Sequence, residues 1–213
     1  LTTGAYRDTY DALMTHYPKL KLNIAKWWIR FEDPEVKRIC VENWDKDGDG
    51  ELSMEEAAAV SSIGTIIPLL RKNSSNAFQE LKFFTGIDVI GVNLLSSCNL
   101  TKIILPNSIR EINQYAFSGN KLKELVIPSS CKRVEGSILD GNAVDCNIIF
   151  KSLIPPVFYN DLLLNRYTRA KIVMYVPDEA LEAYRAIPAL SYRAQLIKEG
   201  VSKCKYHFDD LTV

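Results

Sequence analysis

The chain has 213 residues, and its 26 basic side chains balance its 26 acidic ones, so the formal net charge is zero. With 47% hydrophobic residues, the composition is that of a folded protein and excludes a disordered one. A neutral chain lacks the lysine and arginine excess that binds a phosphate backbone, so nucleic acid is not an expected partner. The longest unbroken apolar run, Ile172 to Val176, is far shorter than the about 18 residues of a membrane-spanning helix.

The ends of the chain and its cysteines give further expectations. Leu1 is not followed by a secretory signal pattern, so we expect a mature or trimmed form whose signal or anchor lies outside this sequence. The five cysteines contain no Cys-x-x-Cys pair, which argues against a zinc site, and a chain this long needs no disulfide framework. We therefore expect small buried thiols.

Residues 1–76 are predicted to form a helical region. Apolar residues recur at helical spacing over residues 6–17, and Pro18 ends that pattern. A second helix is predicted over Asp33 to Trp44, because it opens with an aspartate suited to the N-cap and a proline suited to the first helical position.

A third helix is predicted to start at Ser53. Two glutamates occupy its first turn, where the helix dipole favours acidic side chains. Gly64 and Pro68 are expected to close it, and the polar stretch 71–76 is expected to be a linker or loop.

A repeat of 22 residues begins at Asn99. Asn99 to Asn120 reads NLTKIILPNSIREINQYAFSGN, and Lys121 to Asn142 reads KLKELVIPSSCKRVEGSILDGN. The aligned apolar pairs are Leu100/Leu122, Ile103/Leu125, Leu105/Ile127, Ile109/Cys131, Ile112/Val134 and Phe117/Leu139. The identical pairs are Pro106/Pro128, Ser108/Ser130, Gly119/Gly141 and Asn120/Asn142. The two glycines are read as repeat turns rather than as a phosphate-binding loop.

Weaker copies flank the two clear repeats. Residues 77–98 align when Phe78, Leu81 and Phe83 take the positions of Leu100, Ile103 and Leu105. On the other side, Val144 and Ile149 keep the register before the pattern loosens, and Ala170 to Val176 again resembles a strand followed by proline.

This period predicts an α+β fold built on a short leucine-rich-repeat solenoid in residues 77–213, since leucine-rich repeats span about 20–29 residues. Each coil is expected to offer one short strand, Leu100 to Leu105 or Leu122 to Ile127. A single coil cannot bury its own apolar face, so the coils must stack and the stack needs caps. The helical region 1–76 is the expected N-terminal cap, and Pro177 to Gly200 supplies amphipathic helix for the other end. Pro188 is expected to divide that helix in two.

The segment Asp45 to Glu56, DKDGDGELSMEE, matches the EF-hand calcium loop in full. Calcium prefers six to eight oxygen ligands, and three aspartates spaced two apart can fold their carboxylates around one point. Gly50 permits the sharp turn, Ser53 is placed to act through water, and Leu52 is expected to point into the hydrophobic body. The predicted calcium ligands are Asp45, Asp47, Asp49, the main-chain carbonyl of Glu51, and Glu56.

The loop has alternative readings. A solvated acidic turn would explain the carboxylates but not the accompanying Gly50, Leu52 and Glu56. Dockerin modules share a similar loop, yet they usually carry two copies and an aspartate at the twelfth position. Because the chain has one copy, we expect a structural ion rather than a calcium-regulated switch.

No catalytic residues are predicted. His16 and His207 lie at opposite ends of the sequence outside any motif, and no nucleophile or phosphate-loop motif occurs. A carboxylate pair for glycoside hydrolysis depends on spatial geometry and stays open. Trp27, Trp28 and Phe31 fit either a sugar-stacking platform or ordinary packing.

Four stretches of the chain resemble BspA-like leucine-rich-repeat proteins of bacterial cell surfaces. They are NWDKDGDGELSMEEAAAV (43–60), ELKFFTGI (80–87), LPNSIREINQYAFSGN (105–120) and YVPDEALEAYRA (175–186). The resemblance implies a secreted or surface-anchored binding protein, adhesive toward proteins or cells and without catalytic activity. The chain departs from the family in having few repeats and in its second repeat, where Ser137-Ile138-Leu139 replaces the aromatic-alanine-phenylalanine pattern of Tyr115-Ala116-Phe117.

Two functional hypotheses follow. The first is a recognition module that binds a protein or glycan with its solenoid and uses calcium to lock the N-terminal cap. The second is a structural or accessory surface protein without a ligand of its own. A calcium-regulated switch is a third reading, and it requires a large conformational change when the metal binds.

Overall fold

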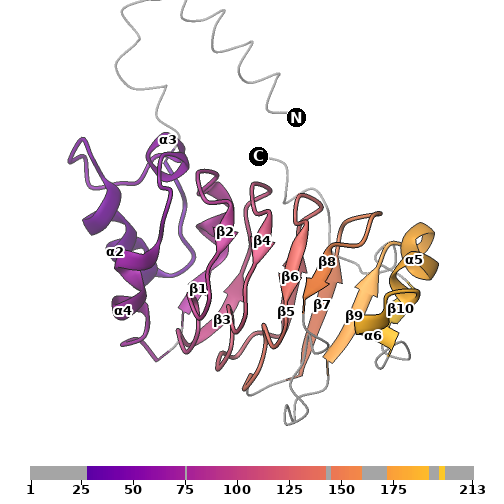
Figure 1. Ribbon diagram of the computed structural model, residues 1–213. Coiled ribbons are helices and arrows are strands. Elements are labelled where there is room, and N and C mark those ends of the chain that lie inside the picture. Colours follow the sequence, from indigo (N-terminus) through magenta and orange to yellow (C-terminus); the bar gives the residue numbers. More distant parts are fainter. Residues whose placement is uncertain (1–27, 75, 143–144, 160–171, 192–196, 200–213) are drawn as a thin grey trace, which may run out of the picture.

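The computed structural model describes residues 28–74, 76–142, 145–159, 172–191 and 197–199. The helix predicted over residues 6–17, the two histidines and Trp27 lie outside these residues. Figure 1 shows a row of short strands that runs from helices α2, α3 and α4 at one end to α5 and α6 at the other. The stacked strands confirm the predicted solenoid; the role of the end helices as caps stays a prediction.

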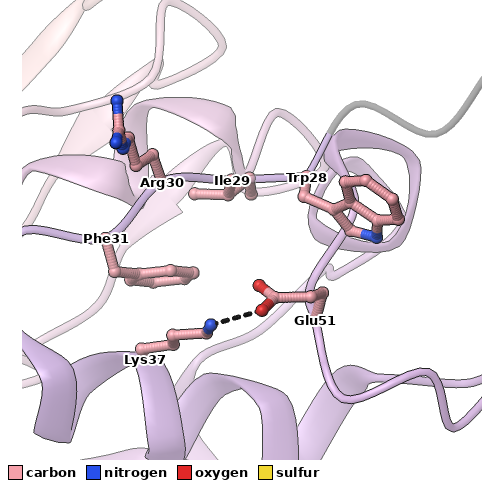
Figure 2. Close-up of a pocket in the computed structure, with 6 residues that line it drawn as sticks. All are labelled: Trp28, Ile29, Arg30, Phe31, Lys37 and Glu51. Carbon is pink, nitrogen blue, oxygen red and sulfur yellow. Dashed lines mark hydrogen bonds and ion pairs between the residues drawn. The ribbon is translucent and has the colours of Figure 1, made fainter. Parts of the chain in front are cut away.

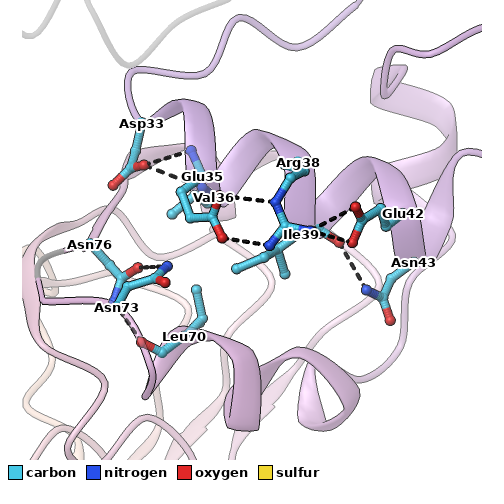
Figure 3. A network of polar contacts seen from close by, with 10 residues as sticks. All are labelled: Asp33, Glu35, Val36, Arg38, Ile39, Glu42, Asn43, Leu70, Asn73 and Asn76. Atoms are coloured by element: carbon cyan, nitrogen blue, oxygen red, sulfur yellow. Dashed lines mark hydrogen bonds and ion pairs between the residues drawn. The ribbon is translucent and has the colours of Figure 1, made fainter.

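Helix α2 (Pro34–Trp44) is the helix predicted from the aspartate–proline start. Asp33 is its N-cap, and Asp33 Oδ1 accepts hydrogen bonds from the main-chain N–H of Glu35 and Val36 (Figure 3). Asp33 Oδ2 accepts a further bond of 3.1 Å from Ala77 N, in the first strand of the solenoid. The same cap therefore starts the helix and ties it to the repeats.

Helix α3 (Met54–Ala58) starts where predicted, with Ser53 as its N-cap, but it is a short helix. Pro68 does not close it. A 3₁₀ turn, η2 (Gly64–Ile66), leads instead into α4 (Ile67–Leu70), with Pro68 in the first turn. A proline fits there because the first helical N–H groups have no intrahelical acceptor. Pro68 was predicted to end a helix, but it lies at the start of one.

All pairs between the described strands are parallel, as stacked coils require. They form sheets of order β1-β3, β10-β9-β7-β5 and β2-β4-β6-β8. The strands are β1 (Asn76–Phe78), β2 (Val89–Ile90), β3 (Leu100–Ile103), β4 (Glu111–Ile112), β5 (Glu124–Ile127), β6 (Arg133–Glu135), β7 (Cys146–Phe150), β8 (Val157–Tyr159), β9 (Ile172–Val176) and β10 (Ile197–Glu199).

Each repeat contributes two strands, not the single strand that was predicted. The predicted strands appear as β3 and β5, and the proline follows each of them. The second strands, β4 and β6, have two and three residues, and they pair at the 22-residue period, with Ile90, Ile112 and Val134 in one row. These three side chains are fully buried.

The predicted register of the first weak repeat is wrong. Asn76, not Phe78, pairs with Leu100, and an irregularity after Asn76 then places Phe78 beside Ile103 in the ladder between β1 and β3. Leu81 and Phe83 are not strand residues, since Gln79–Phe83 forms a 3₁₀ helix, η3. Asn76 itself begins β1 instead of ending a loop.

The register after the second clear repeat also differs. Ile149 pairs with Val126, and Phe150 takes the place beside Ile127 that the 22-residue period assigns to Ile149. One extra residue between the coils causes this shift. Val144 lies outside the described residues.

Buried asparagines connect one coil to the next. Asn120 is 1% exposed; its Oδ1 accepts from Cys98 N (3.1 Å) and Leu100 N (3.0 Å), and its Nδ2 donates to Leu95 O and Phe117 O (both 2.8 Å). Asn142 repeats the pattern one coil later. These side chains supply partners for main-chain groups that strands leave unpaired in the turns.

The turns of successive coils also repeat in backbone conformation. Positive φ angles recur every 22 residues. The residues are Asn93 (55°), Tyr115 (57°) and Ser137 (59°), then Ser97 (54°), Gly119 (65°) and Gly141 (67°). The two glycines are thus repeat turns, as predicted, and the left-handed conformation explains their recurrence.

After β9, the chain forms short helices. They are a 3₁₀ turn η4 (Asp178–Ala180), α5 (Leu181–Arg185) and α6 (Pro188–Ser191). Pro188 begins a separate helix, as predicted. The predicted helix does not continue to residue 200, because Ile197–Glu199 forms β10 and pairs with β9.

A single cluster of buried side chains runs from Ile29 to Ile197. The helical region and the repeats therefore share one hydrophobic core. The division of the chain into two domains at residue 76 stays a prediction. The described cysteines, Cys40, Cys98, Cys131 and Cys146, are free and buried, which confirms the expectation for these four. Burial raises the pKa of the Cys131 thiol to about 11 and that of Cys146 to about 12.

Candidate functional site

The acidic loop lies between α2 and α3, where the sequence places it. One carboxylate oxygen from each of Asp45, Asp47 and Asp49 lies within 4.8 Å of the others. The three side chains are exposed or half-buried, so an ion could reach them from solvent. The structure therefore brings together the three aspartates of the predicted calcium site.

Hydrogen bonds within the loop hold this arrangement. Asp45 accepts from Gly48 N at Oδ1 (2.8 Å) and from Gly50 N at Oδ2 (2.9 Å). Asp49 Oδ1 accepts from Glu51 N (2.9 Å). Gly48 and Gly50 have φ angles of 72° and 84°, so the loop needs a left-handed conformation at both positions. The requirement at Gly50 was predicted, whereas the one at Gly48 was not.

The two predicted glutamates are placed differently from the aspartates. Glu56 Oε1 accepts from Lys46 N (2.9 Å), and its Oε2 accepts from the N–H and hydroxyl of Ser53, which completes a capping box on α3. It does not belong to the aspartate cluster as it stands. The Glu51 side chain forms an ion pair of 2.6 Å with Lys37, so the role of the Glu51 main-chain carbonyl as a calcium ligand stays a prediction.

The back of the loop pairs with an upstream segment. Leu52 is fully buried, as predicted, and its carbonyl accepts from Ile29 N at 2.8 Å. Trp28 forms an antiparallel bridge with Ser53, and its indole Nε1 donates to Asp49 Oδ2 at 3.1 Å. The segment 28–29 therefore holds the loop through hydrogen bonds from a part of the chain that precedes α2. No sequence motif predicts these contacts.

A hollow of about 500 Å³ adjoins the loop on the side of this segment. We call it the loop pocket, and its lining residues are Trp28, Ile29, Arg30, Phe31, Lys37 and Glu51. Figure 2 shows Phe31 and the Lys37–Glu51 pair around one open space, with Arg30 pointing away. Trp28 is 50% exposed, so a large part of this residue is open to solvent.

A buried carboxyl group lies between the helical region and the repeats. Glu80 is 4% exposed, and its Oε1 accepts from Glu32 N at 2.8 Å, while its Oε2 has no hydrogen-bond partner. Burial raises the pKa of Glu80, and the bond from Glu32 N opposes that shift. Sequence reasoning did not single out this residue, because burial is what distinguishes it.

Among the described residues, no helix has the length and apolarity needed to cross a membrane. No curated protein matches the chain. The model of the BspA type leucine rich repeat region matches residues 72–179 in six copies. This match covers just over half of the chain and the whole described run of strands from β1 to β9, so the chain belongs to the BspA-type leucine-rich-repeat family.

Proposed function

We propose that this chain is a non-catalytic recognition module, secreted or displayed on a cell surface, which binds a protein or glycan with its solenoid. Membership of a family of surface repeat proteins supports this role. The observation that carries it is the outer row of the β2-β4-β6-β8 sheet, where one side chain from each coil stands in register.

The outer row combines apolar ends with a charged middle. Successive positions are Val89, Glu111, Arg133 and Val157, with Val89 36% and Val157 57% exposed. Tyr159 lies beside this row and is 47% exposed, with the Arg133 guanidinium 4.2 Å from its ring centre. Such a mixture of exposed aromatic, apolar and arginine groups is typical of recognition surfaces.

The test is ligand capture on an array of glycans and extracellular matrix proteins. We expect saturable binding that weakens by about tenfold or more when Val157→Asp and Tyr159→Ala are combined, because both changes remove exposed contact area. Lys72→Ala, an exposed position before the first strand, is the matched control. Absence of capture across the whole array would instead favour a structural or accessory surface protein.

We also propose that the loop binds one structural calcium ion. The ligands would be the carboxylates of Asp45, Asp47 and Asp49, the Glu51 carbonyl and Glu56. The aspartate cluster and the two left-handed glycines fit that donor set. Glu56 would exchange its bonds to Lys46 and Ser53 for the ion. A bound ion would hold α2 and α3 at the two ends of one loop.

Calcium is expected to raise the melting temperature by about 5–10 °C relative to EDTA. An ion that binds only the folded state at a hundredfold excess over its Kd adds about 2.7 kcal/mol, and a chain of this length gains about 2–4 °C per kcal/mol. Asp45→Asn combined with Glu56→Gln should abolish the shift. Amides are preferable to alanine here, because Glu56 also caps α3 and its removal would destabilise the fold without any ion.

Glu42→Gln is the matched control for this melt. Glu42 is another acid at the end of α2, but it pairs with Arg38 and lies outside the aspartate cluster (Figure 3). It should keep the full calcium shift. Equal melting temperatures of the wild type in calcium and EDTA would refute the metal site and leave the solvated acidic turn.

A further inference from the structure

We propose that the loop pocket is a binding subsite for a neutral pyranose sugar, which its aromatic residues and the Lys37–Glu51 ion pair would hold. The inference names a ligand class for the recognition role and rests on that proposed function. It adds a second binding place, formed by residues of the helical region and not by the repeats.

The pocket offers an aromatic surface that solvent leaves open. Trp28 is 50% exposed although Ile29, next in the chain, is 2% exposed. The Trp28 ring is not loose, because its Nε1 donates to Asp49 and its main chain bridges to Ser53. A held indole face loses little conformational entropy when a ligand packs against it, and the C–H face of a pyranose is apolar enough to do so.

The polar groups of the pocket match sugar hydroxyls. Lys37 Nζ and Glu51 Oε1 lie 2.6 Å apart, and their side chains are 37% and 38% exposed, so both can still reach a ligand. Lys37 can donate to a hydroxyl oxygen, and Glu51 can accept from a hydroxyl group. Because the two charges cancel, the pair favours an uncharged ligand over an acidic sugar or a phosphate.

The dimensions and the remaining walls agree with this chemistry. About 500 Å³ lies within the range of small-ligand sites, and Phe31 supplies a second, half-buried ring. Figure 2 shows Phe31 facing the same space as the ion pair. The Lys37–Glu51 pair crosses from α2 to the loop, so the site would form only when these two elements are in place.

The experiment uses the full chain in millimolar calcium with linear tetrasaccharides of glucose, galactose, mannose and N-acetylglucosamine. Binding is titrated by calorimetry, and acidic tetrasaccharides are run in parallel. We expect at least one neutral probe to bind and Trp28→Ala to weaken it by about tenfold or more. Lys37→Met with Glu51→Gln should weaken the same probe, and Trp28→Phe should retain much of the affinity because a ring remains.

Tyr159→Ala is the comparison variant, because Tyr159 is an exposed aromatic residue beside the outer row of the solenoid and far along the chain from the pocket. Neutral-sugar binding lost in Trp28→Ala and kept in Tyr159→Ala supports the pocket. The reverse pattern overturns the pocket but keeps the proposed recognition role on the solenoid. Binding of acidic sugars alone, or of no sugar while matrix proteins are captured, also overturns the pocket. No binding of any class overturns both proposals. Melting curves show whether each variant folds.

Discussion

Asn120→Ala is expected to lower the free energy of unfolding by about 4 kcal/mol or more. The change removes the side-chain partner of two main-chain N–H groups, of Cys98 and Leu100, and of the Leu95 carbonyl, while the Phe117 carbonyl keeps its bond from Asn142 Nδ2. Each unsatisfied buried group costs about 1–3 kcal/mol, and a small cavity adds to that. Since total stability is about 5–15 kcal/mol, this single amide accounts for a large share.

Urea denaturation followed by circular dichroism measures the effect. Asn107→Ala is the control, because Asn107 is exposed in the turn before β4, and it should change stability by no more than about 0.5 kcal/mol. Asn142→Ala should fall between them, since its Oδ1 accepts one described bond, from Leu122 N at 3.3 Å. A cost below about 1 kcal/mol for Asn120→Ala would contradict the coil-to-coil role of this side chain.

Gly86→Ala is expected to destabilise the protein by about 3 kcal/mol or more. An added Cβ would lie 2.6 Å from both Ala58 O and Val60 O, well inside contact distance. Both are backbone atoms, one in the last residue of α3 and one just after it, so no side chain can rotate away to relieve the clash. Relief requires the turn before β2 to move away from the helical region.

Gly91→Ala provides the comparison, at the residue that directly follows β2. Nothing lies within 4 Å of a Cβ at Gly91, and its φ is not positive. There the extra methyl only restricts the unfolded chain, so stability should stay level or rise by up to about 1 kcal/mol. Thermal melts of both variants would settle the point: similar melting temperatures would mean that the helical region does not press on this turn.

The sequence predicted those elements in which local chemistry and periodicity agree. Helix α2 followed from an N-cap and a proline at its start, and β3 and β5 followed from alternating apolar residues that end at proline. Strands β4 and β6 were missed because two or three residues carry no period of their own. They form strands because the neighbouring coils supply strands for them to pair with. This pairing exists only in the stacked structure.

Register was harder to predict than the existence of strands. A ladder irregularity at Asn76 and one extra residue before Phe150 each displace a pairing, and neither has a distinctive sequence. Ile197–Glu199 was read as helix because its sequence follows a helical pattern, yet the open edge of β9 recruits it as a strand. Tertiary pairing outweighed local propensity in that segment.

The candidate site was predictable only in part, for a similar reason. The spacing of Asp45, Asp47 and Asp49 predicts the loop, because these residues are close in sequence and their arrangement depends on local conformation alone. The pocket could not be predicted in this way, since Trp28, Lys37 and Glu51 are separated in the sequence and come together only in the folded chain. The only sequence signal was the aromatic cluster around Trp28, which fits ordinary packing as well as sugar stacking.

The bridge between Trp28 and Ser53 has a thermodynamic consequence. It joins the acidic loop to the wall of the pocket, with Asp49 bonded to the indole itself. If calcium and a sugar bind as proposed, an ion that restricts the motion of the loop also restricts the Trp28 indole, which contacts the sugar. Linkage is reciprocal, so the factor by which calcium tightens sugar binding must equal the factor by which the sugar tightens calcium binding. In this single loop, calcium binding would therefore be coupled to the binding of a sugar. In paired loops, it is coupled to the binding of a second ion.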